Sequence, residues 1–293
     1  MNGPKDLDLP FFAYGFFRPG EISFMGIKDY VFDVKPVIVK GEIKHRDGLN
    51  FYLDNQQKTV DGYLIYFHSG MGKMAYDFIN SMEPNKLFTW RSGILGDVPY
   101  NVLYGKKPTK GSVENQDEFG RDSVWQDPFF TVALEDTLLN GFVDGNPKIE
   151  NLTHDKMFKL QMKYMLLWTI IERFIFLRYS FGGEVVASTK KFSENLFLKE
   201  ALNKFGFDNP IKRDLYATNY PKNKIRYSKD DSIKAINYYY QVRCNITHRG
   251  KGVHQDLKLL ENCYTELYNI LIYVLRNTRH ECMQVKQQYE DQS

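Results

Sequence analysis

The stretch from Arg243 to Lys251 brings together residue types that can cleave RNA without a metal ion. Arg243 offers a guanidinium that stays charged and can bind phosphate through two parallel hydrogen bonds. His248 offers an imidazole that can take up or release a proton near neutral pH. Transesterification needs a base for the 2′-hydroxyl, an acid for the departing 5′-oxygen and a cation at the phosphate. Arg243, Asn245 and His248 are therefore the first candidate catalytic residues.

The same stretch resembles the R-x4-H motif of the HEPN superfamily, whose all-α domains include many metal-independent endoribonucleases. The resemblance covers about residues 150–285. It implies a helical bundle, RNA as substrate, a 2′,3′-cyclic phosphate product and a role in bacterial defence or as a toxin. Glu172 stands where that family often has an acidic residue, which implies that it orients Arg243 or His248. The alternative is a non-catalytic dimerisation or scaffold module, in which Arg243 simply pairs with Glu172.

The spacing of the motif bears on the oligomeric state. Residues five apart on an α-helix point about 140° away from each other, so one chain presents a splayed half-site. HEPN nucleases complete such a site with a second copy, and the resemblance therefore implies a homodimer through the α domain. The apolar faces of 158–179 and 257–275 also exceed what one small bundle needs. An antitoxin or regulatory partner chain is implied by the same resemblance.

Basic residues follow the motif and recur in the segment before it. Residues 151–293 hold 23 Lys/Arg and 15 Asp/Glu, a net charge of +8 that suits a polyanion. Between residues 204 and 229 cations alternate with tyrosines, a composition typical of single-stranded RNA binding and, equally, of a solvated loop. The candidate RNA-binding residues are Arg249, Lys251, Lys222, Lys224 and Arg226.

A second candidate site lies in the first hundred residues. A glycine-containing turn with Tyr14, Gly15, Arg18 and Gly20 directly follows an apolar strand. Such a turn exposes backbone N–H groups that can hold an anion or a developing oxyanion. Glu83 follows a short amphipathic helix and offers a carboxylate for proton transfer.

These residues resemble the gamma-glutamylcyclotransferase-like family over roughly residues 9–110. The resemblance implies that the loop amides hold the carboxylate of a small molecule and that Glu83 moves the proton during cyclisation. Phe16 and Phe17 stand in the loop, where they either line the pocket or plug it. We expect a pocket that binds a small-molecule ligand or nothing, without useful turnover. The alternative is a small-molecule enzyme that uses Glu83, with the α domain as its dimeriser.

Hydrophobic patterns predict an α+β fold with a β-rich first part and an α-helical second part. The predicted strands are 11–17, 36–43, 49–53, 63–67, 87–90 and 99–104, and the predicted helices are 73–82, 127–139, 153–179, 193–205, 230–248 and 253–286. We expect a small barrel-like domain over 1–110 and a HEPN-like bundle of four main helices over 151–293. Residues 111–150, with a net charge of −7, are expected to be an acidic connector with one helix.

Composition excludes several other classes of protein. A hydrophobic fraction of 43% and a charged fraction of 26% are those of a globular chain. The most apolar stretch spans eight residues, 164–171, whereas a membrane span needs about 20, and no signal segment is expected at the N-terminus. Three cysteines without metal-ligand spacing predict a cytoplasmic protein. No metal or cofactor is predicted, because the chain has no P-loop, dinucleotide fingerprint, nucleophile elbow or H-E-x-x-H sequence.

Overall fold

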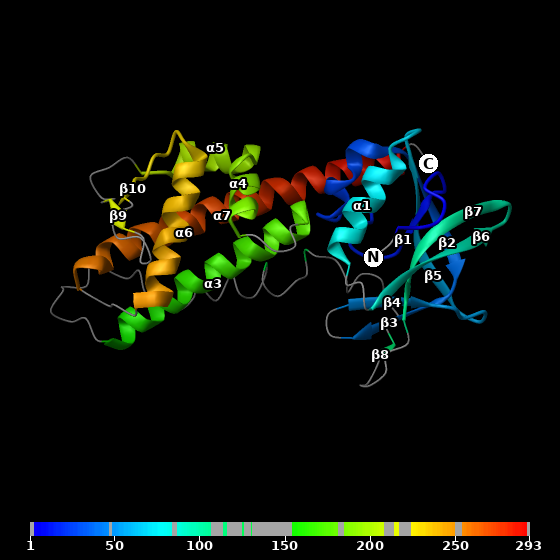
Figure 1. Cartoon of the computed structure of the whole chain (residues 1–293), viewed down its shortest axis with the longest axis horizontal. Helices are drawn as coiled ribbons and strands as arrows, with labels where there is room; N and C mark the ends of the chain where they lie inside the picture. The colour runs from blue at the N-terminus through cyan, green and yellow to red at the C-terminus, as the bar shows by residue number, and fades with distance from the viewer. Residues whose placement is uncertain are drawn as a thin grey trace. The chain divides into compact units, whose positions relative to one another are not determined.

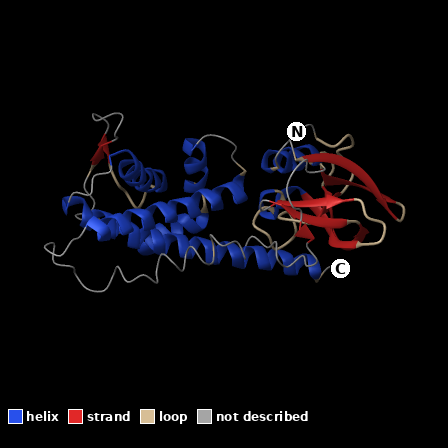
Figure 2. Cartoon of the chain, turned by 90° about the horizontal axis from the view of Figure 1, so that it is seen from below, coloured by secondary structure: helices blue, strands red, loops and turns tan. Residues whose placement is uncertain are grey.

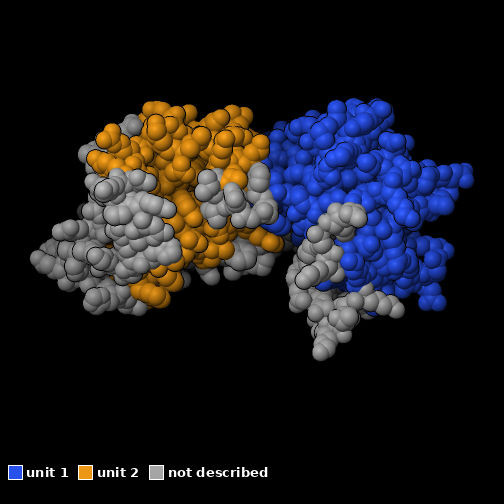
Figure 3. Space-filling view, in the orientation of Figure 1, with its two compact units in different colours: residues 1–127, 176–182, 279–293 blue, residues 128–175, 183–278 orange. Residues whose placement is uncertain are grey.

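The computed structural model of the chain has an α+β fold (Figure 1). It describes residues 3–46, 49–83, 87–106, 114–115, 125, 130, 154–180, 185–207, 214–216, 224–249 and 254–291. Two compact units divide the chain (Figure 3). Unit 1 comprises residues 1–127, 176–182 and 279–293, and unit 2 comprises residues 128–175 and 183–278. The expected connector helix at 127–139 lies outside the described residues, as does most of 111–150.

The strands, drawn in red in Figure 2, lie in unit 1 apart from one small hairpin. A five-stranded mixed sheet has the order β2-β5-β1-β7-β6. These strands are β1 (Phe11–Ala13), β2 (Val31–Lys40), β5 (Thr59–Phe67), β6 (Phe88–Leu95) and β7 (Val98–Gly105). The central strand β1 is antiparallel to β5 and parallel to β7. Because Tyr14 directly follows β1, the middle of the sheet determines where the candidate loop begins.

The described strands form no closed barrel, which corrects the barrel-like expectation. β2 and β6 are the two edges of the large sheet, and a separate three-stranded sheet has the order β4-β3-β8. Its strands are β3 (Glu42–Arg46), β4 (Leu49–Leu53) and β8 (Glu114–Asn115). The predicted single strand 36–43 is wrong at Gly41, where the chain leaves one sheet for the other. The predicted hairpin after β3 is confirmed, because Arg46 pairs with Leu49.

Two glycines of the large sheet lie beneath aromatic rings. A side chain at Gly93 would overlap the ring of Tyr100, the residue directly opposite it in β7. A side chain at Gly62 would overlap the ring of Phe12, which stands on the neighbouring strand β1. The bare backbone at these positions lets a large ring cross the strand, as in the pairing of aromatic residues with strand glycines.

The predicted helix 73–82 is confirmed as α1 (Gly72–Met82). Its buried residues Ala75, Tyr76, Ile79 and Met82 recur at helical spacing and pack on the sheet side of unit 1. The helix ends because Glu83 has an extended backbone, with φ −100° and ψ 134°. The end of α1 therefore fixes the position of the candidate acid/base carboxyl.

Unit 2 is helical. Its long helices confirm the predictions for 153–179, 230–248 and 253–286, with slightly shifted ends. The helices are α3 (His154–Tyr179), α4 (Val185–Ser193), α5 (Leu196–Phe205), α6 (Ser232–Arg249) and α7 (His254–Glu290). α4 was not predicted as a separate helix, and α5 begins later than expected because Asn195 caps it by accepting the backbone N–H of Leu198. A two-strand hairpin, β9 (Leu215–Tyr216) with β10 (Lys224–Ile225), lies in the segment expected to be irregular.

α3 and α7 contribute residues to both units. The last turns of each helix, within 176–182 and 279–293, are grouped with the N-terminal strands. From the acidic connector and the change from strand to helix patterns, the sequence predicted one domain over all of 151–293. Among the described residues, no helix is both long enough and apolar enough to cross a membrane.

Candidate functional site

The R-x4-H stretch lies on α6 in unit 2, and its arginine faces the predicted acidic residue. Nη2 of Arg243 is 4.0 Å from Oε1 of Glu172, which stands on α3. The side chain of Arg243 is 26% exposed and that of Glu172 is 45% exposed, so the pair is reachable from solvent. The structure therefore brings together these two residues of the first candidate set.

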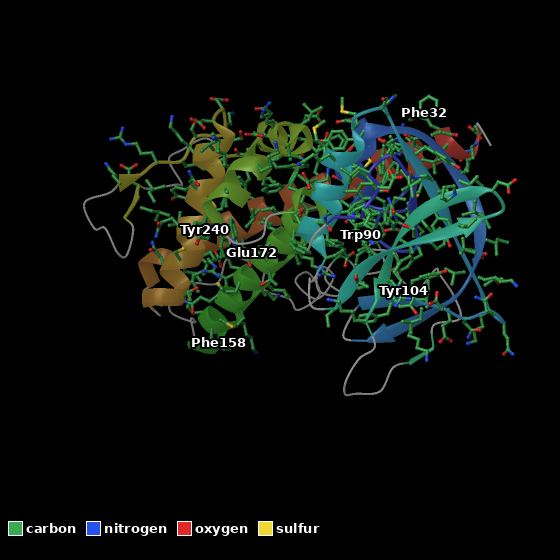
Figure 4. The ribbon with its side chains drawn as sticks, turned by 45° about the vertical axis from the view of Figure 1, so that its right-hand side comes forward. Phe32, Trp90, Tyr104, Phe158, Glu172 and Tyr240 are labelled. Atoms are coloured by element: carbon green, nitrogen blue, oxygen red, sulfur yellow. The ribbon has the colours of Figure 1, made fainter. Side chains whose placement is uncertain are left out.

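An aromatic residue that the sequence analysis missed stands between this pair and the interior. The ring centroid of Tyr240 is 5.9 Å from Cζ of Arg243 and 5.3 Å from the ring centroid of Trp168. Burial raises the pKa of the Tyr240 hydroxyl, and a hydrogen bond with the side chain of Cys244 raises it further. Figure 4 shows Glu172 on α3 and Tyr240 on α6. The signal for Tyr240 was present in the sequence, because residues three apart on a helix are neighbours.

The remaining residues of the motif continue along α6. Asn245 accepts a hydrogen bond from Nε2 of Gln241 (2.8 Å), within the same helix. Thr247 donates its hydroxyl to the backbone oxygen of Arg243 (3.0 Å) and lies 3.6 Å from Sδ of Met165 on α3. His248 belongs to the last turn of α6, but its side chain lies outside the described residues. Since α6 is helical from Ser232 to Arg249, the whole motif has helical spacing.

Two of the candidate RNA-binding cations, Lys224 and Arg226, have described side chains, and both are paired with an acidic residue. Lys224 and Arg226 both form ion pairs with Asp214, and the Arg226 Nε–Asp214 Oδ1 distance is 3.8 Å. One carboxylate therefore offsets part of the charge that these two residues would offer to a phosphate. Lys222 and Lys251 lie outside the described residues, as does the side chain of Arg249.

In unit 1, the loop from Tyr14 to Gly20 is held by its own polar groups. The hydroxyl of Tyr14 donates to the backbone oxygen of Leu103 (2.8 Å). Nε of Arg18 donates to the backbone oxygen of Gly15 (3.2 Å), and Nη2 lies 3.9 Å from Oε1 of Glu21. These contacts fix Arg18 against the loop that contains it.

Gly20 is the most crowded residue of the loop. Its φ of +93° favours glycine, and a Cβ there would lie 3.0 Å from Cδ of Lys286, near the end of α7. Its backbone oxygen accepts a hydrogen bond from Nε1 of Trp125 (3.0 Å), a residue of the predicted connector. The Cβ position of Gly15, in contrast, has no neighbouring atom within 4 Å.

Phe17 packs in the interior, so it neither lines nor plugs a pocket from the solvent side. It is 4% exposed, and its ring contacts those of Phe11 (6.1 Å) and Phe78 (6.3 Å) at steep angles. Phe16 remains half-buried. The two alternatives stated for these phenylalanines therefore concern Phe16 alone.

Glu83 and Tyr14 are brought together at the end of α1. Burial raises the pKa of Glu83 to about 7. Burial also raises the pKa of Tyr14 well above its usual range, and the nearby charge of Glu83 adds to the effect. A carboxyl with a pKa near neutrality can either give or take a proton, which is the property that general acid–base chemistry needs.

A second tyrosine missed by the sequence analysis lies beside this pair. The ring centroid of Tyr52, on β4, is 5.6 Å from that of Tyr14, and its hydroxyl donates to the backbone oxygen of Lys40 (2.7 Å). Nothing in the local sequence pattern marks Tyr52 as a site residue, because strand pairing between distant segments brings it beside Tyr14.

Within the described residues, no three His, Cys, Asp or Glu side chains gather closely enough to hold a metal ion.

Comparisons of the chain with protein-family models, with curated proteins and with solved structures find no significant match.

The raised pKa of Glu83 predicts how stability depends on pH. The folded state holds the proton of this carboxyl up to about pH 7, whereas the unfolded chain releases it near pH 4.5. The contribution of the Glu83 carboxyl to folding stability is therefore fully present below pH 4.5 and is lost progressively as the pH rises to 7. We therefore predict that, between pH 5 and 8, the free energy of unfolding of wild type falls by up to about 3 kcal/mol relative to that of Glu83→Gln, as measured by urea unfolding. If the free energy of unfolding depended on pH in the same way in both proteins, Glu83 would be solvated like an ordinary carboxylate.

Proposed function

We propose that the chain is a metal-independent endoribonuclease of the HEPN type, acting in a bacterial defence or toxin system, whose N-terminal unit senses a small molecule. The observation that carries the proposal is the pairing of Arg243 with Glu172 across α6 and α3. Their contact orients a permanently charged guanidinium beside the last turn of a helix that also contains His248. The proposed setting is cytoplasmic, in keeping with the free thiols of Cys244, Cys263 and Cys282.

The proposed chemistry is transesterification within the RNA strand. A base removes the proton of the 2′-hydroxyl, and the 2′-oxygen forms a bond to phosphorus while the bond to the 5′-oxygen breaks. An acid protonates that leaving oxygen, so the products are a 2′,3′-cyclic phosphate and a 5′-hydroxyl. His248 serves in proton transfer, Arg243 binds the phosphate oxygens, and Glu172 orients Arg243. Asn245 lies within the motif as a further polar group, and Arg249 and Lys251 would bind neighbouring phosphates.

A homodimer completes this proposed site. Arg243 and His248 are splayed on one helix, so a second copy of α6 facing the first would supply the missing proton-transfer group. An exposed apolar stripe on α3 supports this arrangement, because Phe158 is 58% exposed and Met162 is 43% exposed. The stripe leads to Met165, which contacts Thr247 of α6. An antitoxin or regulatory chain would bind the same assembly.

We predict that Arg243→Ala and His248→Ala each reduce cleavage of total RNA by roughly 10²–10⁴-fold, because each removes a group needed in the transition state. Cleavage is measured with purified protein in EDTA, by following the 2′,3′-cyclic phosphate ends. Arg276→Ala and His280→Ala are matched controls, since both residues are exposed on α7. Unchanged cleavage in the His248 variant, or cleavage abolished by EDTA, would contradict metal-independent cleavage with proton transfer by His248.

We predict that the double variant Phe158→Asp, Met162→Asp is monomeric and inactive, because two carboxylates on the exposed stripe oppose burial against a second copy. Light scattering at micromolar concentration gives the mass, and circular dichroism shows whether the helices remain. The matched control is Leu196→Asp, which places a charge on another exposed apolar residue of unit 2, 64% exposed on α5. A monomeric wild-type chain would contradict the composite site directly.

A second function is favoured by one observation in unit 1, the near-neutral pKa of Glu83 beside Tyr14. A protonated carboxyl there can donate a hydrogen bond to a ligand carboxylate, which suits a sensing role. In the enzymatic alternative, the α-amino nitrogen of the γ-glutamyl group attacks the γ-carbonyl carbon, and the bond from that carbon to the departing amine breaks. Glu83 takes the proton of the attacking nitrogen and returns this proton to the departing amine. The α domain would then serve as the dimeriser.

Phe16 is half-buried in the loop, and a ring of this size would narrow the approach of a substrate. We therefore expect wild-type protein to release no 5-oxoproline from γ-glutamyl dipeptides. The product is followed by chromatography, with Glu83→Gln as the matched variant. Release that disappears in Glu83→Gln would establish the cyclotransferase instead. Equal RNA cleavage by the two proteins would show that the two sites work independently.

A further inference from the structure

The guanidinium of Arg243 has few partners for a half-buried charge. Its closest acidic group is Oε1 of Glu172 at 4.0 Å, which is too long for a hydrogen bond. Its Nε is buried and has no hydrogen-bond partner within the described part of the chain. An unpaired buried donor costs roughly 1–3 kcal/mol, so such an atom calls for an explanation. The ion pair with Glu172 alone does not provide one.

Within the described residues, the ring of Tyr240 also contacts this guanidinium. Cζ of Arg243 lies 5.9 Å from the ring centroid, within the range of a cation–π interaction. The ring is itself held by Trp168, at 5.3 Å between centroids and 41° between planes. Trp168 is 1% exposed, so packing fixes its side chain. The guanidinium therefore has a contact that connects it to the interior of the bundle.

This contact differs from an ion pair in what it leaves available. An arginine has five N–H donors, and a carboxylate partner would occupy two of them. A ring face attracts the positive charge without accepting those hydrogen bonds in full. An arginine held by a ring is therefore restrained in position while its donors stay available for a phosphate. Restraint before binding lowers the entropy lost when the phosphate arrives.

We propose that Tyr240 is a positioning residue for Arg243, with its ring, backed by Trp168, holding the guanidinium so that its donors face an incoming phosphate. The catalytic consequence rests on the proposed nuclease function, whereas the positioning itself does not. The hydroxyl of Tyr240 forms a hydrogen bond with Cys244, whereas the face of its ring contacts Cζ of Arg243. Substitution by phenylalanine therefore keeps the positioning surface, and substitution by leucine removes it.

Nuclear magnetic resonance on protein labelled with ¹⁵N-arginine tests the positioning without requiring activity. The Nε–H resonance of Arg243 is assigned from its disappearance in Arg243→Lys. We expect a ring-current shift and a nuclear Overhauser contact to the Tyr240 ring protons in wild type. Both should persist in Tyr240→Phe, the latter to the phenylalanine ring, and the shift should vanish in Tyr240→Leu. An Nε–H of wild type with no contact to the ring overturns the proposal, even if the leucine variant fails to fold.

Kinetics test the consequence for catalysis. We expect Tyr240→Leu to lose roughly tenfold in kcat/KM, while Tyr240→Phe stays within about twofold of wild type. The loss should appear mainly in kcat, because misplacement weakens contacts that matter most in the transition state. Tyr273→Leu is the matched control, since Lys204 lies 5.4 Å from that ring elsewhere in unit 2. A phenylalanine variant as impaired as the leucine variant would show that the hydroxyl matters, which contradicts the proposal.

The two arms separate failure of the proposed function from failure of this inference. A wild-type chain that cleaves no RNA refutes the nuclease, and the resonance of Arg243 then decides the positioning by itself. A chain that cleaves RNA normally in Tyr240→Leu keeps the nuclease function and refutes the positioning role.

Discussion

Close passage of aromatic rings over strand glycines is the constraint on which the architecture of unit 1 depends. Phe12 lies over Gly62 and Tyr100 lies over Gly93, so these rings connect β5 to β1 and β7 to β6 across the sheet. Without a bare backbone at either glycine, the ring would have to move and the neighbouring strands would separate. β1 and β7 carry Tyr14 and its hydrogen-bond acceptor Leu103, so the geometry of the loop follows from this packing. Glu83 then depends on it too, because α1 packs through Tyr76 against Phe11 of β1.

The two candidate sites obtain their chemistry from burial in opposite ways. At Glu83 burial changes the protonation state, so that the carboxyl is poised near neutrality. Arg243 keeps its charge at any relevant pH, so partial burial instead leaves its Nε donor without an acceptor among the described residues. The first arrangement suits proton movement or recognition of an anion by a neutral acid. The second suits attraction of a phosphate, and the two units therefore differ in the kind of ligand that they can hold.

Local sequence patterns predicted most of the helices and one hairpin. α1 and α7 were predicted because their apolar residues repeat at helical spacing, and the β3–β4 hairpin because Asp47-Gly48 separates two strand-like runs in the sequence. α4 was missed: it lies between the predicted helices 153–179 and 193–205, and it opens with two β-branched residues, Val185 and Val186, whose helix propensity is low. The break at Gly41 and the open sheet depend on which distant strands pair, which no local pattern encodes.

The same distinction applies to the candidate sites. The pairing of Glu172 with Arg243 was foreseen as one alternative, since two helices of a bundle face each other. Tyr52 beside Tyr14, and Trp125 on the oxygen of Gly20, depend on contacts between remote segments. Tyr240 could have been predicted from its position three residues before Arg243 on the same helix, but an aromatic ring is not among the groups that acid–base chemistry requires.

The end of α7 contacts residues of unit 1 that are synthesised much earlier. Tyr289 packs edge-on against Phe24 (5.8 Å), Glu281 pairs with Lys28 (3.6 Å), and Lys286 crosses Gly20. Each of these α7 residues follows its partner by more than 250 residues in the chain, so it is synthesised later. At roughly 5–20 residues per second, residues 20–28 wait on the order of ten seconds or more for these contacts to form. During that interval Phe24, which is fully buried in the finished unit, lacks its contact with Tyr289, so chaperones have a window in which to bind this segment.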